Sequence, residues 1–362
     1  MRILMFIGTR PEAIKMLPLA KELRLEKGIE LSICYSGQHG ALASEVFDFF
    51  KIAPNFEFDA LVKGQSLNQL ICRLLDYFDV VLKKSNPDLV LVHGDTATAF
   101  AASLSAFHLG IKTGHIEAGL RTFDMSSPYP EEFYRVAIDA MSSLHFAPTE
   151  LSAKNLKKEG RNGIFTVGNT VIDAFSYTLK NDYKSSILSD ADGRKIILLT
   201  THRRENLGEK MRNSLMGLRD VLDACSDLFC IWPAHPNPEV RKMAFDMFCN
   251  VKNIKIFEPI SVFDFHNILW RSHFVVTDSG GIQEEASYLG IPTFLIRDTT
   301  ERAEGVKSGN IRVLGTSREG IRDGILSVIR DKDEFQKMRI PSLVFGDGNA
   351  SKKIAKILLS MA

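Results

Sequence analysis

Residues 275–289 carry the sequence VVTDSGGIQEEASYL, and this stretch is the best guide to the fold. Its apolar start predicts a short strand ending near Thr277, its Ser-Gly-Gly segment predicts a turn, and the residues from Gln283 onward predict an acidic helix start. Such a turn leaves backbone N–H groups unpaired at a positive helix end, and glycine lets a phosphate approach them closely. An ordinary strand-to-helix turn capped by Asp278 or Ser279 is the alternative, and the stretch alone leaves both open.

Composition limits the class of protein. A chain of 362 residues predicts two domains of roughly 150–200 residues each. The 45 Lys and Arg nearly balance the 44 Asp and Glu, and this charge argues against nucleic acid or an acidic membrane surface as a partner. No apolar run reaches the length of about 18 residues that spans a membrane. The five cysteines lack metal-site spacing and predict reduced thiols in a cytoplasmic protein without a structural metal.

Strand-like and helix-like segments alternate along both halves of the chain. In the first half, strands are expected at residues 3–7, 30–35, 88–92, 112–116 and 144–147, and helices at 13–25, 67–84, 97–109 and 136–143. In the second half, strands are expected at residues 195–199, 228–232, 254–257 and 293–296, and a final helix at 350–361. This alternation predicts an α/β fold with two Rossmann-like, doubly wound domains that face a central cleft.

Three segments follow from this pattern. Residues 1–168 are expected to form the N-terminal domain, which carries the candidate catalytic carboxylates, and residues 169–345 the C-terminal domain, which carries the anion site. The helix within residues 346–362 is expected to pack back on the N-terminal domain. In parallel sheets ligands bind at the carboxyl ends of strands, and polar loops follow four strands of the first half, at residues 8–12, 36–39, 93–96 and 117–119. One shared active cleft is therefore predicted.

Four carboxylates of the first half are candidates for proton transfer: Asp95, Glu117, Glu131 and Glu132. Carboxylates held in one cleft have pKa values that are driven apart, so that one donates a proton and another accepts it. Helix caps and surface charges are the alternative for each of them. Metal ligation by Asp95 is less favoured, because no second carboxylate stands at a suitable spacing.

Cationic side chains also follow strands. His202 precedes two arginines and is a candidate for charge neutralisation or proton transfer near a phosphate. Arg10 and Lys15 are spaced to reach one ligand, although solvated surface charge explains them too. Glu285 is placed to accept hydrogen bonds from ribose hydroxyls. Arg302 is a candidate phosphate ligand, with an ion pair to Glu301 or Glu304 as the alternative.

Eight motifs in order resemble one enzyme family. They are GTRPE at residues 8–12, HGDT at 93–96, HIEAGLRT at 115–122, PEE at 130–132, HRREN at 202–206, HPNP at 235–238, DSGGIQEEA at 278–286 and TER at 300–302. Together they resemble the non-hydrolysing UDP-N-acetylglucosamine 2-epimerases, and they run from the first expected strand to near the C-terminus.

The resemblance implies a GT-B-like pair of domains, a homodimer, and no added metal or nicotinamide cofactor. It also implies that UDP-GlcNAc and UDP-ManNAc interconvert by anti elimination and re-addition of UDP through a glycal, supplying ManNAc-type sugars for surface polysaccharide synthesis. It assigns Asp95, Glu117 and Glu131 to the proton at carbon 2, and His202 to the leaving diphosphate. Further binding residues implied are Arg10, Lys15, Ser279, Gly280, Gly281 and Arg302 at the phosphates, Glu285 at the ribose, and Ile260 and Phe265 near the uracil.

Other functions remain open at this level. An epimerase for a related UDP-2-acetamido sugar has the same motifs, and a glycosyltransferase of the same fold that uses a UDP-sugar also needs the anion turn and a downstream glutamate. A catalytically silent sensor of nucleotide sugars is less favoured, since the candidate carboxylates and His202 are all present. Which carboxylate removes the proton and which returns it is also undecided.

Overall fold

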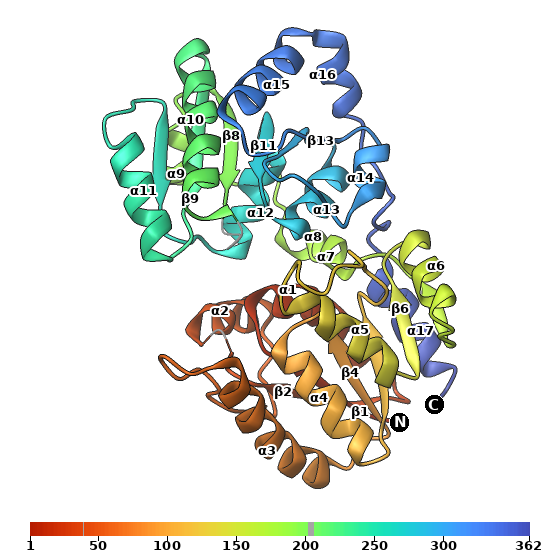
Figure 1. Ribbon diagram of the computed structural model, residues 1–362. Coiled ribbons are helices and arrows are strands. Elements are labelled where there is room, and N and C mark those ends of the chain that lie inside the picture. The colour runs from red at the N-terminus through yellow and green to blue at the C-terminus, as the bar shows by residue number, and fades with distance from the viewer. Residues whose placement is uncertain (39, 202–205) are drawn as a thin grey trace. The chain divides into compact units, whose positions relative to one another are not determined.

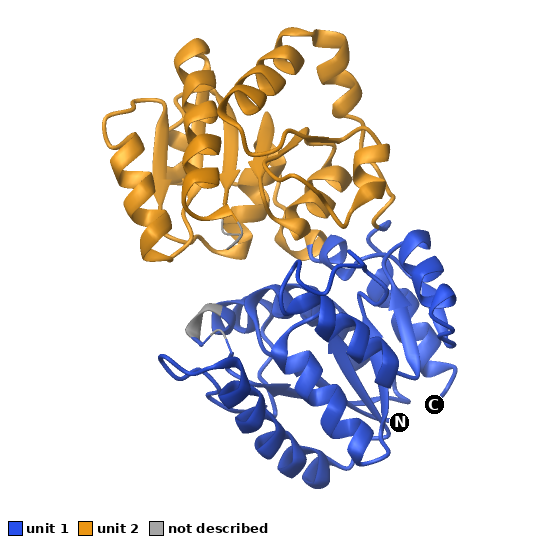
Figure 2. Cartoon of the chain, viewed as in Figure 1, with its two compact units in different colours: residues 1–174, 346–362 blue, residues 175–345 orange. Residues whose placement is uncertain are grey.

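The computed structural model describes residues 1–38, 40–201 and 206–362. The chain forms two compact units: unit 1 contains Met1–Ala174 and Gly346–Ala362, and unit 2 contains Phe175–Phe345 (Figure 2). We expected the boundary after residue 168. Unit 1 extends six residues further because the short helix α7 (Thr170–Asp173) packs against helices of that unit.

Unit 1 is built on a seven-stranded parallel sheet with the strand order β3-β2-β1-β4-β5-β6-β7 (Figure 1). Its strands are β1 (Arg2–Ile7), β2 (Glu30–Tyr35), β3 (Phe56–Glu57), β4 (Leu89–His93), β5 (Lys112–Ile116), β6 (Leu144–Ala147) and β7 (Ile164–Thr166). Its other helices are α1 (Arg10–Leu25), α2 (Ala41–Phe50), α3 (Leu67–Ser85), α4 (Ala97–His108), α5 (Glu131–Met141), α6 (Glu150–Lys158) and α17 (Ala350–Leu359).

The central strands of unit 1 are buried on both faces. Every residue of β4 is buried, and so is every residue of β1 after the first, which explains their continuous apolar sequences. On one face, Phe6 of β1 packs edge-on against Phe78 of α3, with the ring centroids 4.5 Å apart. Helices α3, α4 and α5 contact one another in series, and α1 contacts α2, α7 and α17 (Figure 1).

The C-terminal helix α17 is anchored to unit 1 by a single carboxylate. The backbone N–H groups of Ala350 and Ser351 donate to the two oxygens of Asp173, at 3.2 Å and 2.7 Å. A carboxylate at a helix N-terminus satisfies unpaired donors and opposes the helix dipole. Helix α17 also packs along α1, so residues 346–362 belong to unit 1.

Unit 2 is built on a six-stranded parallel sheet with the order β10-β9-β8-β11-β12-β13. Its strands are β8 (Lys195–Thr200), β9 (Leu228–Pro233), β10 (Ile254–Phe257), β11 (Phe274–Thr277), β12 (Thr293–Leu295) and β13 (Ile311–Val313). Its helices are α8 (Phe175–Thr178), α9 (Ser186–Ser189), α10 (Glu209–Ala224), α11 (Pro238–Phe248), α12 (Val262–Arg271), α13 (Gly280–Leu289), α14 (Ala303–Lys307), α15 (Arg318–Arg330) and α16 (Lys332–Met338).

Both sheets have Rossmann-like strand order, which confirms the expected α/β class with two doubly wound domains. In each sheet the order reverses beside the first strand, between β1 and β4 in unit 1 and between β8 and β11 in unit 2. Loops at the carboxyl ends of these neighbouring strands are the usual place for a ligand. Within the described residues, none of the helices combines the length and the apolar character needed to cross a membrane.

Three expected helix starts were wrong. Helix α1 begins at Arg10 and not at residue 13, with Thr9 as its capping residue. Helix α5 begins at Glu131, five residues before the expected start, because its first turn follows Pro130 directly. Helix α13 begins at Gly280 and not at Gln283, with Ser279 as the capping residue. The two glycines are therefore the first two helical residues, whose N–H groups have no partner within the helix.

Candidate active site

The first site loop of unit 1 joins β1 to α1 and is fixed by its own sequence. The Thr9 hydroxyl accepts a hydrogen bond from the Glu12 N–H, while the Glu12 side chain bonds back to the Thr9 N–H at 2.7 Å, which forms a capping box. Glu12 also accepts from the Gly8 N–H at 3.1 Å and from the Thr96 hydroxyl at 2.8 Å. Thr96 follows β4, so Glu12 connects the two loops on either side of the strand-order reversal.

Burial raises the pKa of Glu12 to about 7 from its usual 4.5, although hydrogen bonds from Thr96, Thr9 and Gly8 oppose the rise. The folded protein then holds a proton that the unfolded chain releases, so the stability from this group is present below pH 4.5 and is lost as pH rises through 7. Relative to the variant Glu12→Gln, we expect the wild type to lose on the order of 3 kcal/mol of unfolding free energy across this range. Urea unfolding at several pH values measures the difference in unfolding free energy between the wild type and Glu12→Gln. A difference that does not change with pH would contradict the prediction.

Glu117 lies at the centre of a group of polar side chains after β5. Lys15 of α1 and the Asn169 amide both donate to Glu117 Oε2 at 2.5 Å, and the Glu117 side chain is only 8% exposed. Its backbone has φ of +66°, a conformation that is uncommon for residues other than glycine and is concentrated at functional sites. The carboxylate is thus held in one place by two elements far apart in the sequence.

His93 is the third neighbour of Glu117, with its Nε2 3.7 Å from Glu117 Oε2. Burial lowers the pKa of His93 to about 3, with Lys15 adding to the decrease and Glu117 opposing it. The imidazole is therefore neutral at pH 7, and Lys15 supplies the cationic partner of the carboxylate. We predicted Lys15 as a phosphate ligand, whereas in the structure it is ion-paired with Glu117.

Asp95 belongs to a second group of ion-paired side chains. Arg135 of α5 forms ion pairs with Asp95 and with Glu132, the latter at 3.2 Å. Glu132 also accepts the N–H groups of Thr122 and Phe123, at 2.9 Å and 3.0 Å. Glu132 therefore anchors the loop before α5, while Asp95 keeps a side chain that is 27% exposed.

Glu131, the first residue of α5, is half-buried, and we find no hydrogen bond or ion pair of its side chain within the described part of the chain. Asn169 and Arg135 were not among the predicted residues. The sequence indicated Asn169 only weakly, through the polar segment Gly168-Asn169-Thr170 at the end of the first half. It did not indicate Arg135 as a site residue, because Arg135 is one charged residue on an amphipathic helix.

In unit 2 the turn after β11 leads directly into the N-terminus of α13. The Ser279 N–H donates to the Thr277 hydroxyl at 2.9 Å, and the Gln283 amide donates to the Ser279 carbonyl at 3.1 Å. An added Cβ at Gly281 would meet no atom within 4 Å, so the first helical turn is open there. Open N–H groups at a helix N-terminus favour phosphate.

Arg302 lies directly against this turn. Its Nε donates to Glu284 at 2.6 Å and its Nη1 to Glu301 at 2.5 Å. A Cβ on Gly280 would lie 2.3 Å from Arg302 Nη1, so glycine is required for the guanidinium to occupy this space. The ion pair with Glu301, which we gave as the alternative to phosphate binding, is present, and it holds a cation beside the helix N-terminus.

The remaining predicted residues of unit 2 lie on α12 and α13 or before them. Glu285 of α13 is 8% exposed, and its Oε2 lies 3.8 Å from His266 Nε2. Ile260 and Phe265 are partly buried and pack against the apolar cluster between α12, α13 and the sheet. His202 lies outside the described residues. Of its motif, Asn206 is described, and its amide donates to the fully buried Asp278 at 3.2 Å.

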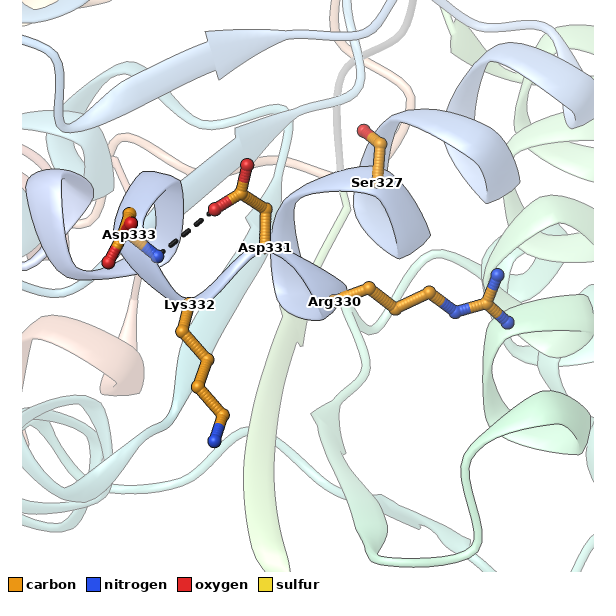
Figure 3. Close-up of a pocket in the computed structure, with 5 residues that line it drawn as sticks. All are labelled: Ser327, Arg330, Asp331, Lys332 and Asp333. Atoms are coloured by element: carbon orange, nitrogen blue, oxygen red, sulfur yellow. Dashed lines mark hydrogen bonds between the residues drawn. The ribbon is translucent and has the colours of Figure 1, made fainter.

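A hollow of about 650 Å³ in unit 2 is unrelated to these loops (Figure 3). It is lined by Ser327, Arg330, Asp331, Lys332 and Asp333, at the junction of α15 and α16. Helix α15 runs back from the carboxyl end of β13, so its last residue lies at the opposite edge of the sheet. In Figure 3 Asp331 accepts the Asp333 N–H, at 3.0 Å, as a helix cap. Among residues 1–38, 40–201 and 206–362, we find no group of three or more His, Cys, Asp or Glu suited to a metal ion.

Known proteins resemble this chain over nearly its full length. The family model of UDP-N-acetylglucosamine 2-epimerase matches residues 21–359. The UDP-N-acetylglucosamine 2-epimerase of Bacillus subtilis is 43% identical over 99% of this chain and 95% of its own length. The enzyme of the same name from Escherichia coli K12 is 38% identical over 99% and 98%.

Solved structures agree with the sequence relatives. The S. aureus MnaA–UDP co-structure has a TM-score of 0.94, with 38% identity over 100% of this chain and 97% of that one. The UDP-GlcNAc 2-epimerase from Neisseria meningitidis bound to UDP-GlcNAc has a TM-score of 0.95, with 38% identity over 99% and 100%. These matches confirm the GT-B-like α/β class. The chain belongs to the family of UDP-N-acetylglucosamine 2-epimerases.

Proposed function

We propose that this protein interconverts UDP-N-acetylglucosamine and UDP-N-acetylmannosamine by inverting carbon 2 of the sugar. Family membership supports the proposal, and so do the two kinds of side chain at the strand ends. Unit 1 supplies carboxylates for a proton, and unit 2 supplies an open helix N-terminus beside Arg302 for a diphosphate. The observation that carries the proposal is Glu117, whose side chain is 8% exposed and is held by Lys15 and Asn169, at an uncommon backbone conformation.

The proposed reaction has two halves that balance without an oxidant or reductant. A carboxylate removes the proton from carbon 2, the electron pair of that bond forms a double bond to carbon 1, and the bond from carbon 1 to the UDP oxygen breaks. UDP leaves with the electron pair of the bond between carbon 1 and the UDP oxygen, and a glycal remains. A proton then returns to the opposite face of carbon 2, and the UDP oxygen attacks carbon 1 again. None of these steps transfers a hydride, so the proposed route does not use a nicotinamide.

Each predicted residue has a role in this proposal. The proton at carbon 2 is weakly acidic, so stabilising the charge on departing UDP must supply much of the driving force. Asp95, Glu117 and Glu131 handle the proton, and Lys15 forms an ion pair with Glu117. The proposed UDP ligands are Arg10, His202, Ser279, Gly280, Gly281 and Arg302 at the phosphates, Glu285 at the ribose, and Ile260 and Phe265 at the uracil. A homodimer, implied by the sequence resemblance, completes the proposal and is tested by light scattering.

Incubation with UDP-GlcNAc in deuterated water tests the reaction. We expect UDP-ManNAc to form and both sugars to acquire deuterium at carbon 2, as seen by NMR. Release of the sugar to an acceptor, without exchange at carbon 2, would indicate the glycosyltransferase alternative. Exchange with a different UDP-2-acetamido sugar, and none with UDP-GlcNAc, would indicate a related epimerase.

A further inference from the structure

A buried histidine next to the proposed carboxylates has a role that none of the motifs assigns. His115 of β5 is fully buried. Its Nδ1 lies 2.6 Å from Asp139 Oδ1 of α5, and its Nε2 lies 2.7 Å from the Gly94 carbonyl oxygen, in the turn after β4. Both ring nitrogens are therefore within hydrogen-bond distance of an oxygen.

The hydrogen-bond partners determine which ring nitrogen donates to the Gly94 carbonyl. A carbonyl oxygen only accepts, so Nε2 must donate to Gly94. The other carboxylate oxygen of Asp139 accepts from Arg121 Nη2 at 2.7 Å and from the Gly119 N–H at 3.2 Å. Asp139 is thus held in place by Arg121 and Gly119, and it holds the Nδ1 side of the ring so that Nε2 faces the Gly94 carbonyl.

Asp139 also connects His115 to Arg121. Its carboxylate lies 2.6 Å from His115 Nδ1 and 2.7 Å from Arg121 Nη2, and Arg121 also pairs with Glu159 at 2.7 Å. Two further histidines are near this group: His93 on β4, which burial keeps neutral, and His145 on β6, whose Nε2 lies 2.9 Å from the Asp139 main-chain oxygen. The paired guanidinium makes the burial of the Asp139 carboxylate tolerable.

The Gly94 turn connects this group to the site. The Gly94 N–H donates to the Ile116 carbonyl at 2.9 Å and its carbonyl accepts from His115, so β5 holds the Gly94 residue on both sides. Gly94 has φ of +62°, and a Cβ added to it would lie 3.6 Å from Glu117 Oε1. Asp95 follows Gly94 directly, and Glu117 follows Ile116. The turn therefore sets the position of both carboxylates.

We infer that His115 positions the Gly94 turn, and with it Asp95, relative to Glu117, through the hydrogen bond from its Nε2 to the Gly94 carbonyl. This inference rests on the proposed function for its effect on turnover, while the hydrogen bond itself stands apart from it. Removing the donor to Gly94 leaves a buried carbonyl unpaired and frees the turn to move. A displacement of about 1 Å in a catalytic group lowers turnover by on the order of 100-fold.

Two substitutions separate the two hydrogen bonds of the ring. His115→Asn keeps an amide donor near the Nδ1 position, facing Asp139, and leaves Gly94 without a donor. His115→Gln carries its amide nitrogen near the Nε2 position and keeps a donor for Gly94. We expect kcat to fall by about 10- to 100-fold in His115→Asn, with KM and UDP affinity within about threefold, and to recover in part in His115→Gln.

A second buried histidine provides the control. His145 of β6 contacts the main-chain oxygens of Asn162 and Asp139, both at 2.9 Å, and reaches neither Gly94 nor a carboxylate. His145→Gln is expected to cost stability while kcat per folded protein stays unchanged. Equal kcat per folded protein in His115→Asn, His115→Gln and the wild type would overturn the positioning role.

The hydrogen bond to Gly94 is measured on the wild-type protein, without any substitution. With ¹⁵N-labelled histidine, we expect Nε2 of His115 to carry a proton. An Nε2 without a proton would overturn the hydrogen bond to Gly94 even if the variants fail to fold. If UDP-GlcNAc shows no exchange in the wild type, the proposed function fails, and the spectrum still decides whether Nε2 donates to Gly94.

Discussion

Glu117→Gln is expected to lower kcat for epimerisation by about 100- to 10,000-fold, the usual contribution of a positioned general acid or base. The amide has nearly the shape of the carboxylate, so the backbone at Glu117 and its contact with Asn169 can persist. It cannot accept a proton from carbon 2, and Lys15 loses its counter-charge. Initial rates of UDP-ManNAc formation, and deuterium incorporation at carbon 2, measure the effect.

Asp88→Asn is the matched control for this substitution. Asp88 is also an ion-paired carboxylate of unit 1, bonded to Arg2 at 3.1 Å, but it precedes β4 and so lies at the opposite edge of the sheet. Asp88→Asn should leave kcat unchanged. UDP affinity should stay near the wild-type value in Glu117→Gln, because the proposed UDP ligands of unit 2 are intact. Wild-type exchange at carbon 2 in Glu117→Gln would remove this residue from the proposed mechanism.

Gly280→Ala is expected to lower kcat/KM by about 100- to 1000-fold, as removal of an oxyanion donor commonly does. The added methyl group would lie 2.3 Å from Arg302 Nη1 and 2.6 Å from Cζ. Arg302 cannot yield easily, because Glu284 and Glu301 hold it on two sides. Either the guanidinium or the first turn of α13 must shift, and both are proposed ligands of the leaving diphosphate. Calorimetric titration with UDP measures the loss of binding.

Substitution of the neighbouring Gly281 distinguishes the effect of Gly280→Ala from a general cost of alanine in this turn. Gly281→Ala meets no protein atom, so the thermal stability of the ligand-free protein should be unchanged, whereas Gly280→Ala should lower it. Removing the guanidinium makes room for the methyl group, so Gly280→Ala should cost less stability in an Arg302→Ala background than in the wild type. Additive effects of the two substitutions would show that Arg302 is not what requires glycine here.

Local sequence was enough to predict most of the strands and their order of appearance. Expected strands at residues 30–35, 112–116, 144–147 and 254–257 have those bounds in the structure. Apolar runs and turn residues act within a few positions of one another, so they can be identified without knowing the fold. The boundaries of α5 and α13 were missed, because Pro130 and Gly280 suggest turns and the helices begin at or next to them.

The sequence by itself therefore determined the α/β alternation, the polar loops after the strands and the glycine turn before α13. Only the tertiary structure decided which side chains meet. Lys15 and Glu117 are 102 residues apart, Asn169 and Glu117 are 52 apart, and Arg135 and Asp95 are 40 apart. Lys15 and Glu117 meet because β1, β4 and β5 are neighbours in the sheet, whereas Asn169 follows β7 and Arg135 lies on α5. Strand order and helix packing are properties of the whole folded chain. The roles of Asn169, Arg135 and His115 follow from that order, since ion pairs and hydrogen bonds depend on distances that no local pattern records.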